Sequence, residues 1–393
     1  MTLDEILPEL TPRIAAIRRD IHAHPELAFG EWRTAEIVAQ HLEKLGLMVQ
    51  RGLAGTGVVG TLQVGSSRRA IGLRADMDAL PLEELNACAH RSTHPGQMHA
   101  CGHDGHTAML LGAAEALVAL RHAGRFDGTV HFIFQPAEEH EGGARVMIEQ
   151  GLFKRFPMDA VYGLHNWPGL PVGEMAVLPG ALMAGADRFE IVITGRGGHA
   201  AMPHQATDTV LAGAALVQAL QMLVARHTDP QEPAVLSVTR FHAGHADNVL
   251  PETACLGGTV RTFSEAQQSL MESAMRRVCE GIATTHGVHV SLDYEHGYPP
   301  TINSLAETAL CAEVAAQTLG PARVRTDLRP SMGAGDFAYM LRERPGCYAW
   351  LGNGNGGGQG GCMLHSPHYD FNDEIIPLGI AYWVRLVKRA LPV

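Results

Sequence analysis

The spacing of apolar residues predicts how helices and strands follow one another in the first part of the chain. Residues 2–23 and 31–45 repeat apolar side chains at the period of an amphipathic helix. Short, continuous apolar runs are typical of strands that are buried on both faces of a sheet, and such runs lie at residues 70–76, 132–135 and 160–164. Further helical segments are expected at residues 107–120 and 144–152. This order predicts an α/β fold with a doubly wound, mostly parallel sheet.

The pattern changes near Ala184, where the predicted order becomes strand, helix, strand, strand, helix, strand. These elements are expected at residues 188–194, 206–225, 234–240, 254–262, 265–285 and 288–294. A β-α-β-β-α-β order is that of the ferredoxin-like fold, and a complete unit in mid-chain is typical of an inserted domain. We therefore predict a catalytic domain of residues 1–184 and 297–393, interrupted by an inserted domain of residues 185–296.

The composition narrows the class of protein. The chain has 393 residues, 46% hydrophobic and 18% charged, which is typical of a globular enzyme with two domains. A formal net charge of −11 argues against nucleic acid or an anionic membrane as a partner, so an anionic substrate would need a local Arg or Lys. No apolar run approaches the ~18 residues of a membrane span, and the acidic N-terminus lacks a secretory-signal pattern. Seven cysteines, an odd number, predict no disulfide framework and a cytoplasmic location.

Two glycine-rich stretches have only part of the pattern of a nucleotide site. Residues 55–60, Gly-Thr-Gly-Val-Val-Gly, have the spacing of the dinucleotide fingerprint, but β-branched residues follow where a helix should begin. Residues 352–361 are nearly all Gly and Asn, and neither a helix nor a P-loop Lys follows them. We therefore place the first stretch in or before a hairpin and the second in a surface loop.

Candidate chemistry begins with two consecutive carboxylates, Glu138 and Glu139, which follow an apolar strand that ends at Pro136. Catalytic groups gather at the carboxyl ends of parallel strands, and adjacent acids repel each other unless a cation or a shared proton relieves them. An exposed acidic turn would explain this stretch equally well if it stood alone. In a metal cluster, one glutamate would coordinate while the other takes a proton from a water molecule whose pKa the metal lowers.

Cysteine and histidine supply the other candidate ligands. Cys101 and His103 would point to one side in extended backbone, and both residue types bind zinc or a similar ion. The second cysteine pair of a structural zinc site is absent from the sequence, which favours an open, catalytic site completed by the twin glutamates, His165 and His365. Five further histidines stay open as alternative ligands: His90, His94, His99, His106 and His368.

Other chemistries fit the sequence less well. A nucleophilic serine would need a Gly-x-Ser-x-Gly turn, which the chain lacks. Cys101 could instead be a nucleophile with His103 as its base. His22 and His24 have a spacing that suits metal binding, but Pro25 after them favours a helix cap and turn.

Taken together, the motifs resemble the aminoacylase and hippurate hydrolase family of dinuclear metallo-amidohydrolases. Indole-acetyl-amino-acid hydrolases, N-acetyl-diaminopimelate deacetylases and carboxypeptidase G are related to this family. The resemblance covers nearly the whole chain and is carried by residues 18–26, 74–81, 101–106, 135–139, 163–165, 197–204, 248–251 and 365–368.

The resemblance implies roles for residues of the catalytic domain. The implied metal ligands are Cys101, His103, Glu139, His165 and His365. Glu138 would be the general base. Asp76, a further catalytic candidate, corresponds to an acid behind a metal-binding histidine of relatives, and Arg74 stands where those relatives have that histidine. Gly335 departs from the family pattern, because it replaces the glutamate of a Gly-Glu-Asp-Phe motif.

The inserted domain resembles a lid and dimerisation domain. His199 would polarise the scissile carbonyl, often across a dimer interface, while Asn248 and Arg261 would hold the carbonyl and the carboxylate of the substrate. The planar fork of an arginine suits a carboxylate and supplies the local positive charge that an anionic substrate needs. The implied partners are therefore a small-molecule substrate and further copies of the chain, in a homodimer or a larger homo-oligomer.

The resemblance also implies a cofactor and a reaction. Two divalent metal ions per subunit are expected, zinc or manganese before cobalt or nickel, and the Cys, His and carboxylate ligands suit zinc. The expected reaction is hydrolysis of an N-acyl amino acid, with an acetyl, benzoyl or longer acyl group. A dipeptidase or an N-acetyl-diaminopimelate deacetylase stays open, as does a non-catalytic metal-binding protein, against which the intact set of candidate residues argues.

Overall fold

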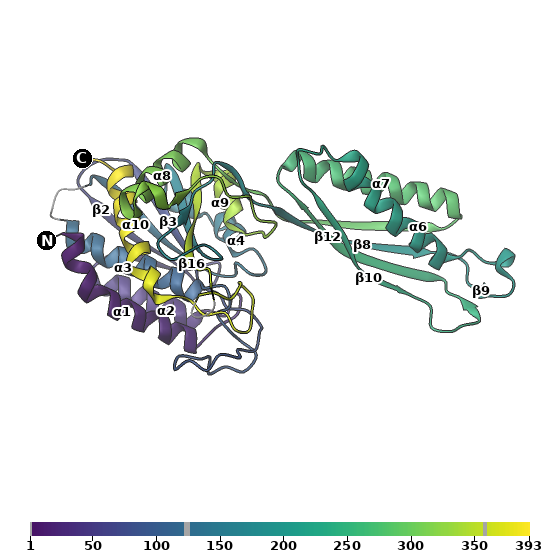
Figure 1. Cartoon of the computed structure of the whole chain (residues 1–393), viewed down its shortest axis with the longest axis horizontal. Coiled ribbons are helices and arrows are strands. Elements are labelled where there is room, and N and C mark those ends of the chain that lie inside the picture. The colour runs from purple at the N-terminus through teal and green to yellow at the C-terminus, as the bar shows by residue number, and fades with distance from the viewer. Residues whose placement is uncertain (1, 122–125, 357–359) are drawn as a thin grey trace. The chain divides into compact units, whose positions relative to one another are not determined.

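The apolar runs predicted to be buried strands lie side by side in an eight-stranded sheet (Figure 1). The computed structural model describes residues 2–121, 126–356 and 360–393. Across the sheet the strands are β1 (Met48–Leu53), β2 (Gly57–Val64), β4 (Gly128–Gln135), β3 (Ala70–Asp76), β5 (Ala160–Pro168), β16 (Gly346–Gly354), β6 (Met175–Ala176) and β15 (Val324–Arg325). The four central strands, β4, β3, β5 and β16, run parallel, and three of them, β3, β4 and β5, contain the continuous apolar runs that predicted a parallel sheet.

The chain divides into two units, which are described separately. Unit 1 contains the large sheet and comprises Met1–Leu182, Ile302–Arg329 and Asp336–Val393. Unit 2 comprises Met183–Thr301 and the short segment Pro330–Gly335. The sequence predicted the inserted domain at residues 185–296 and did not single out the short segment. A separate two-stranded pair is formed by β7 (Gly180–Met183) and β14 (Thr301–Asn303).

Helices cover both faces of the sheet in unit 1, as a doubly wound fold requires. One face carries α1 (Leu3–Ala23), α2 (Trp32–Lys44), α3 (His103–Leu120), α8 (Leu305–Leu319) and α10 (Ile376–Ala390). The other carries α4 (Gly143–Glu149), α5 (Leu152–Arg155) and α9 (Phe337–Glu343). Nearly every residue of α3 is buried, because this helix packs against the sheet on one side and against α1 and α10 on the other.

Unit 2 has the predicted ferredoxin-like order. Its elements are β8 (Gly185–Thr194), α6 (Thr209–Met222), β10 (Val235–Ala243), β12 (Thr253–Thr262), α7 (Glu265–His286) and β13 (His289–Tyr298). The sheet order is β10-β12-β8-β13, with neighbouring strands antiparallel. Apolar residues on one face of this sheet, such as Phe189, Ile191 and Ile193, form a core with α6 and α7. A short ribbon of β9 (Gly198–His199) and β11 (Val249–Leu250) extends from the sheet.

One segment of unit 2 is more apolar than the sequence analysis recognised. Within the described residues, Thr209–His227 is the helical segment that is long and apolar enough to cross a membrane by length and composition, with a mean hydropathy of 1.5. Its buried residues Ala212, Leu216, Leu220 and Leu223 belong to the core of unit 2. The apolar face of this segment is therefore packed against its own sheet.

Several element boundaries differ from the predictions. The helix expected from residue 107 begins at His103, and β5 continues past residue 164 to Pro168. Residues 352–354 were predicted to lie in a surface loop, but they end β16, and Asn353 is buried with its amide hydrogen-bonded to Asp370 O and its carbonyl to Asn372 N. Residues 357–359 of that predicted loop lie outside the described residues. Residues 55–60 lie in the β1–β2 hairpin, as predicted.

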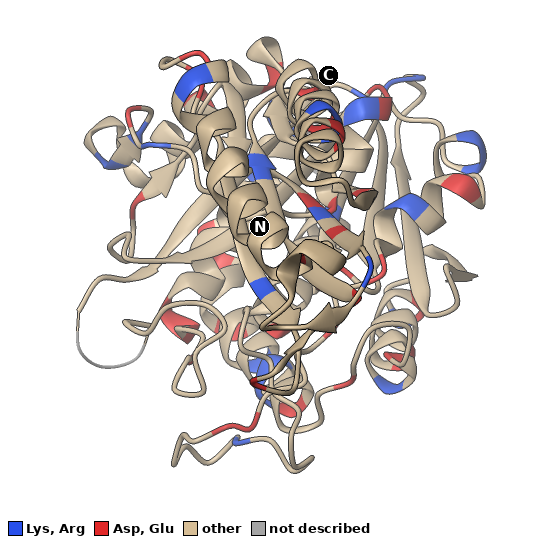
Figure 2. Cartoon of the chain, turned by 90° about the vertical axis from the view of Figure 1, so that its right-hand side faces the viewer, with Lys and Arg blue, Asp and Glu red and all other residues tan. Residues whose placement is uncertain are grey.

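Charged residues are interspersed along the elements (Figure 2). Acidic and basic side chains pair within helices, as Arg145 Nη1 does with Glu149 Oε1 at 2.9 Å and Arg276 Nη2 with Glu272 Oε1 at 2.7 Å. Such exposed pairs one helical turn apart contribute little to stability, typically about 0.3–0.5 kcal/mol. These exposed ion pairs therefore do not indicate a functional site.

Candidate functional site

The carboxyl ends of the parallel strands bring the candidate side chains of unit 1 together. β3 ends at Asp76, β4 leads into Glu138 and Glu139, and β5 contains His165. Cys101 and His103 lie at the start of α3. His365 approaches from a loop, with a left-handed backbone (φ 63°) and its amide donating to Ala100 O at 2.8 Å. One edge of the sheet thus gathers sulfur, imidazole and carboxylate donors.

A left-handed turn at Gly102 places Cys101 and His103. Gly102 has φ +89°, and a Cβ there would lie 2.2 Å from Asn166 Nδ2 and 2.4 Å from the Tyr369 hydroxyl, so only glycine fits. Asn166 Nδ2 in turn donates to Cys101 O at 2.6 Å. The expectation that extended backbone turns Cys101 and His103 to one side is wrong, because His103 is the first residue of a helix. The two donors still converge, through this turn.

The donor atoms form two triads that share Cys101. Cys101, His103 and His165 make up one, and Cys101, Glu139 and His365 the other, with the ligand atoms of each within 4.8 Å of one another. Cys101 Sγ lies 3.5 Å from His165 Nε2, and His365 Nε2 lies 3.1 Å from Glu139 Oε1. Thiolate, imidazole and carboxylate are the ligands that zinc and similar ions take. The five predicted ligands are thus brought together.

The histidine ring nitrogens are oriented for metal binding. His103 Nδ1 lies 2.9 Å from Asp78 O and His165 Nδ1 lies 2.6 Å from Asn166 O. A carbonyl can only accept, so Nδ1 carries the proton in both rings and Nε2 presents a lone pair to the cluster. Nε2 of His103 is buried and has no hydrogen-bond partner among the described residues. A bound cation would satisfy this orphaned nitrogen, so the residues present fit a metal centre.

Asp78 links the two halves of the cluster, although the sequence analysis did not single it out. Its Oδ1 lies 3.2 Å from His103 Nδ1, and its Oδ2 accepts the Glu139 backbone N–H at 3.0 Å. One buried carboxylate therefore orients one histidine and one glutamate of the candidate ligand set. Its position two residues after Asp76, at a strand end, was the signal in the sequence.

The twin glutamates differ in their surroundings. Burial raises the pKa of Glu138 well above its usual range, and the Glu139 and Asp336 carboxylates add to this. Burial acts in the same direction on Glu139, but His365 and His103 outweigh it and lower the pKa of Glu139. Glu138 Oε1 accepts the backbone N–H of Asp336 at 3.2 Å. Glu139 is therefore suited to stay anionic as a ligand, and Glu138 to hold a proton.

A buried ionic network lies behind the glutamates. Arg74 donates to Asp76 Oδ2 at 2.5 Å, to Asp336 Oδ1 at 3.1 Å and to Gln135 Oε1 at 2.7 Å. Asp76 Oδ1 also lies 2.6 Å from His106 Nδ1. Asp76 and Arg74 thus neutralise each other, and Asp76 Oδ2 lies 3.7 Å from His103 Nε2. Asp336, which follows Gly335 in its motif, belongs to this network: its carboxylate accepts from Arg74 and its backbone N–H donates to Glu138.

None of the five alternative histidines belongs to the two triads that share Cys101. Asp76, His103 and His106 also lie close enough to hold an ion, but His106 Nε2 accepts the Asn166 N–H at 2.9 Å and His106 Nδ1 faces Asp76, so both of its nitrogens are used. His90, His94, His99 and His368 belong to none of the metal-ligand groups among the described residues. His24 is the C-cap of α1, as predicted for this segment.

The three candidate residues of unit 2 lie at two ends of its sheet. His199 and Asn248 are exposed, and the β9–β11 ribbon holds them near each other, with Ala200 N donating to Asn248 O at 3.0 Å. Arg261 is half-buried and pairs with Ala186, eight ladder positions from the Thr194–Thr253 pair next to that ribbon. At about 3.3 Å per residue, Arg261 lies roughly 25 Å along the sheet from that pair. Burial and the charge of Arg188 lower the pKa of Arg261.

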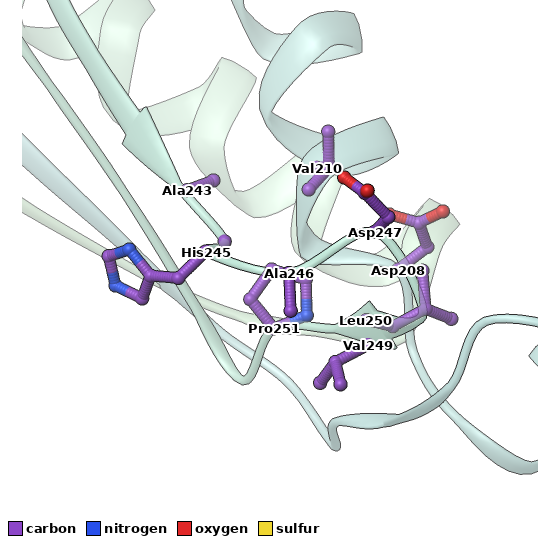
Figure 3. Close-up of a pocket in the computed structure, with 10 residues that line it drawn as sticks. Asp208, Val210, Ala243, His245, Ala246, Asp247, Val249, Leu250 and Pro251 are labelled. Carbon is purple, nitrogen blue, oxygen red and sulfur yellow. The ribbon is translucent and has the colours of Figure 1, made fainter.

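His199 presents a hydrogen-bond donor to solvent. The Ala201 backbone N–H donates to His199 Nδ1 at 3.0 Å, so the proton of the neutral ring is on Nε2. The loop of residues 243–251, which contains Asn248, borders an open hollow of about 420 Å³. Figure 3 shows Asp208 and Asp247 on one side of this hollow and the His245 ring turned away from it. The hollow lacks the donor set of the unit 1 cluster.

Comparisons with known proteins agree with this geometry. The model of peptidase family M20/M25/M40 matches residues 72–389. A hippurate hydrolase of Campylobacter jejuni is 39% identical over 389 residues, covering 99% of both chains. An N-acyl-L-amino acid amidohydrolase of Geobacillus stearothermophilus is 44% identical over 307 residues, covering 77% of this chain and 82% of the relative. The crystal structure of Bacillus subtilis YXEP, a dinuclear metal binding peptidase from the M20 family, superimposes with a TM-score of 0.85 at 35% identity, covering 98% of this chain and 99% of that one.

Proposed function

Because the chain belongs to peptidase family M20/M25/M40 and is an amidohydrolase of the hippurate hydrolase type, we propose that it hydrolyses N-acyl amino acids to a carboxylic acid and a free amino acid. The observation that carries this proposal is the pair of ligand triads sharing Cys101, with Glu138 beside them. Relatives with this activity in their names, at 39% and 44% identity, support the substrate class.

The dinuclear metal site of this family fits the two triads. Cys101 would be the shared ligand, completed by His103 and His165 on one side and by Glu139 and His365 on the other. Two divalent ions bound there would polarise the amide carbonyl and lower the pKa of a water molecule. Thiolate, imidazole and carboxylate donors suit zinc, with manganese, cobalt or nickel as further candidates.

Glu138 is the proposed general base. Its buried carboxyl group has a raised pKa and is held by the Asp336 N–H at 3.2 Å. A carboxylate with raised proton affinity can take a proton from the attacking water and pass it to the leaving amine. Glu139 differs because His365 and His103 keep it anionic, which suits a ligand.

His199, Asn248 and Arg261 are the proposed substrate contacts of unit 2. The outward Nε2–H of His199 would stabilise the developing oxyanion, and one such donor is typically worth about 3–4 kcal/mol. Asn248 would hold the carbonyl and Arg261 the carboxylate of the amino acid. Since Arg261 lies roughly 25 Å along the sheet from Thr194 and Thr253, the strand ends next to the ribbon that carries His199, one copy of unit 2 cannot place both side chains on one small substrate. We therefore propose a homodimer in which each site receives His199 and Asn248 from the other subunit.

The role of Glu138 is tested by Glu138→Ala with metal content measured in the same sample. We expect retained metal and a loss of hydrolysis of about 10²–10⁴-fold, the range of general acid–base catalysis. Retained metal with unchanged hydrolysis would remove Glu138 from this role. Sharing across a dimer is tested by mixing His199→Ala subunits with Glu138→Ala subunits. Recovered activity in verified mixed dimers supports sharing, and no recovery counts against it.

The acyl group and the metal are tested together. Acetyl-, benzoyl- and long-chain-acyl amino acids, a dipeptide and N-acetyl-diaminopimelate should be assayed with each candidate metal. We expect the N-acyl amino acids to have the highest kcat/KM. A preference for the dipeptide would instead agree with the carboxypeptidases of Saccharolobus solfataricus, which are 36% and 37% identical to this chain.

A further inference from the structure

Glu31 is a buried carboxylate that the proposed mechanism does not use. It directly precedes α2, and its side chain has no exposed surface. Its Oε1 accepts two backbone N–H groups, from Phe29 at 3.1 Å and from Ala137 at 2.9 Å. Its Oε2 accepts the Thr56 hydroxyl at 2.5 Å. One carboxylate therefore joins three segments, and one of them is the turn that leads into Glu138.

Glu31 is free for this task because another glutamate caps its helix. A residue at this position commonly accepts a backbone N–H from the first turn of its own helix, yet Glu31 makes no such bond. Glu26 takes its place, with Oε1 and Oε2 accepting the N–H groups of Arg33 and Thr34, each at 2.9 Å. The two nearby glutamates thus have separate roles.

The two backbone groups that Glu31 Oε1 binds belong to residues in an unfavourable conformation. Phe29 and Ala137 have φ values of 58° and 55°, in the left-handed region that non-glycine residues rarely adopt. Such residues persist only where the surroundings hold them, and they cluster at functional sites. Ala137 directly precedes Glu138, so its left-handed turn sets the direction in which that glutamate leaves the strand.

The turn at Ala137 is tightly enclosed on its other sides. A Cβ on Gly143 would lie 1.8 Å from Pro136 O, and one on Gly57 would lie 3.2 Å from Pro136 Cδ. Gly143 N also donates to Ala137 O at 2.9 Å. The Ala137 N–H is buried with that residue, so an acceptor must be supplied from elsewhere. Glu31 supplies it from a position 106 residues away in the chain.

We propose that Glu31 is a positioning residue of the active site, which fixes the Pro136–Ala137 turn and thereby aims the carboxylate of Glu138. This inference rests on the proposed role of Glu138 as general base. Burial raises the pKa of Glu31 to about 7, so the group is not fully ionised near neutral pH, whereas the Phe29 and Ala137 N–H groups need an oxygen acceptor in either protonation state. What the turn needs is an oxygen acceptor at the right distance.

Two substitutions of Glu31 distinguish the effect of side-chain length from the effect of side-chain charge. Glu31→Gln keeps the length of the side chain and an oxygen for the Phe29 and Ala137 N–H groups, while the Thr56 hydroxyl can rotate to accept from the new amide. Glu31→Asp keeps a carboxylate but is one methylene shorter. Glu26→Asp is the matched control, since it shortens a carboxylate of the same segment that binds two backbone N–H groups of α2. Glu138→Ala is measured in parallel.

The experiment measures kcat, KM and bound metal for each variant on a substrate that the wild-type enzyme cleaves. We expect Glu31→Asp to lower kcat about 10–100-fold, because a displacement of about 1 Å can cost 10²-fold, with KM and bound metal close to wild type. Glu31→Gln should retain kcat within about threefold, and Glu26→Asp should leave kcat unchanged even if it unfolds more readily.

Three results would overturn the proposal. The first is a wild-type kcat in folded Glu31→Asp. The second is a loss of kcat in Glu31→Gln as large as that in Glu31→Asp, and the third is a loss of kcat that large in Glu26→Asp. If Glu31→Asp does not fold, low kcat in folded Glu31→Gln is itself decisive against the proposal and near-normal kcat supports it. An active Glu138→Ala variant would defeat the proposed role of Glu138 as general base, whereas an inactive Glu138→Ala beside a fully active Glu31→Asp would defeat the Glu31 proposal alone.

Discussion

The metal-ligand cluster of unit 1 and the candidate substrate contacts of unit 2 are held in opposite ways. In unit 1, hydrogen bonds to other residues orient the candidate ligands, as those of Asp78 to the His103 ring and to the Glu139 backbone N–H do. Most of these groups are buried. In unit 2, His199 and Asn248 are exposed on a two-stranded ribbon, and the bonds that hold them involve the local backbone.

This difference separates two tasks. A metal centre needs several donors fixed at short distances before the ion arrives, and buried hydrogen bonds provide this. A group that contacts substrate only during turnover must stay accessible, so its neighbours cannot enclose it. We therefore expect changes in the unit 1 cluster to affect metal binding and stability, and changes at the tip of unit 2 to affect turnover alone.

Cys101→Ala should have the largest effect, because it removes a ligand from both triads at once. We expect loss of bound metal and a fall in kcat/KM of about 10³-fold or more, equivalent to about 4 kcal/mol. Metal analysis and steady-state kinetics check this. Cys255→Ala is the control, since Cys255 is a half-buried cysteine of unit 2, and it should keep metal and activity. Two bound ions and wild-type kcat/KM in Cys101→Ala would exclude a shared ligand.

His22 should produce the next largest effect, on stability and its pH dependence. Burial opposes a charge on His22, but Asp104 at 2.9 Å and Glu84 at 3.3 Å outweigh it and raise its pKa to about 9. A pKa raised in the folded state gives stability that is complete below pH about 6.5 and is lost as pH rises through about 9. We expect a loss of up to about 3 kcal/mol over this window.

The four tryptophans of the chain provide the measurement. Trp32, Trp167, Trp350 and Trp383 all lie in unit 1, so urea unfolding followed by tryptophan fluorescence reports on that unit. His22→Gln should lower the free energy of unfolding at pH 6 and flatten its decline toward pH 9. His289→Gln, an exposed histidine of unit 2, should leave the profile unchanged. A wild-type profile without a decline between pH 6.5 and 9 would show that His22 is not charged in the folded protein.

The fold and the type of site could be predicted because they depend on patterns that are visible in the amino-acid sequence. Continuous apolar runs identified the parallel strands, and the change of period near Ala184 identified the inserted ferredoxin-like unit. The carboxyl ends of parallel strands meet at one edge, so Glu138, Glu139 and His165 were expected to lie close together. The family predicted from the motifs is confirmed, whereas the individual roles of these residues stay predictions.

The detailed geometry of the site could not be predicted, because it depends on contacts between residues far apart in the sequence, which the spacing of apolar residues does not indicate. His103 converges with Cys101 through the left-handed Gly102, which is confined by the side chain of Asn166 in β5. The sequence made Asp76 a catalytic candidate and did not single out Asp78, but the fold shows that Asp78 binds His103 and Glu139 while Asp76 is held by Arg74. The separation of His199 from Arg261 likewise follows from strand register, which the sequence alone left undetermined.

Asp78→Asn should weaken metal binding by about 10–100-fold, the usual effect of removing a partner behind a ligand, or about 1.4–2.7 kcal/mol. The amide keeps one acceptor oxygen, so it cannot serve both the His103 ring and the Glu139 N–H. Asp187→Asn is the matched control, because Asp187 is a buried carboxylate of unit 2 that accepts from Tyr294 Oη at 2.7 Å and from Gln268 Nε2 at 2.6 Å. It should destabilise unit 2 without changing metal affinity. Equal metal affinities in the two variants would contradict the role of Asp78.

The smallest effects on stability are expected for His199→Ala and Asn248→Ala. Both side chains are exposed, and the Asn248 contact with Ala200 uses only backbone atoms, so each substitution should change the free energy of unfolding by less than about 0.5 kcal/mol. Bound metal should stay at the wild-type level while kcat falls, since the ligand triads lie wholly in unit 1. Circular dichroism during unfolding, metal analysis and kcat measured on one preparation check all three quantities. A loss of metal or of several kcal/mol in either variant would mean that the tip of unit 2 supports the metal centre as well as turnover, and the separation of tasks between the units would then be wrong.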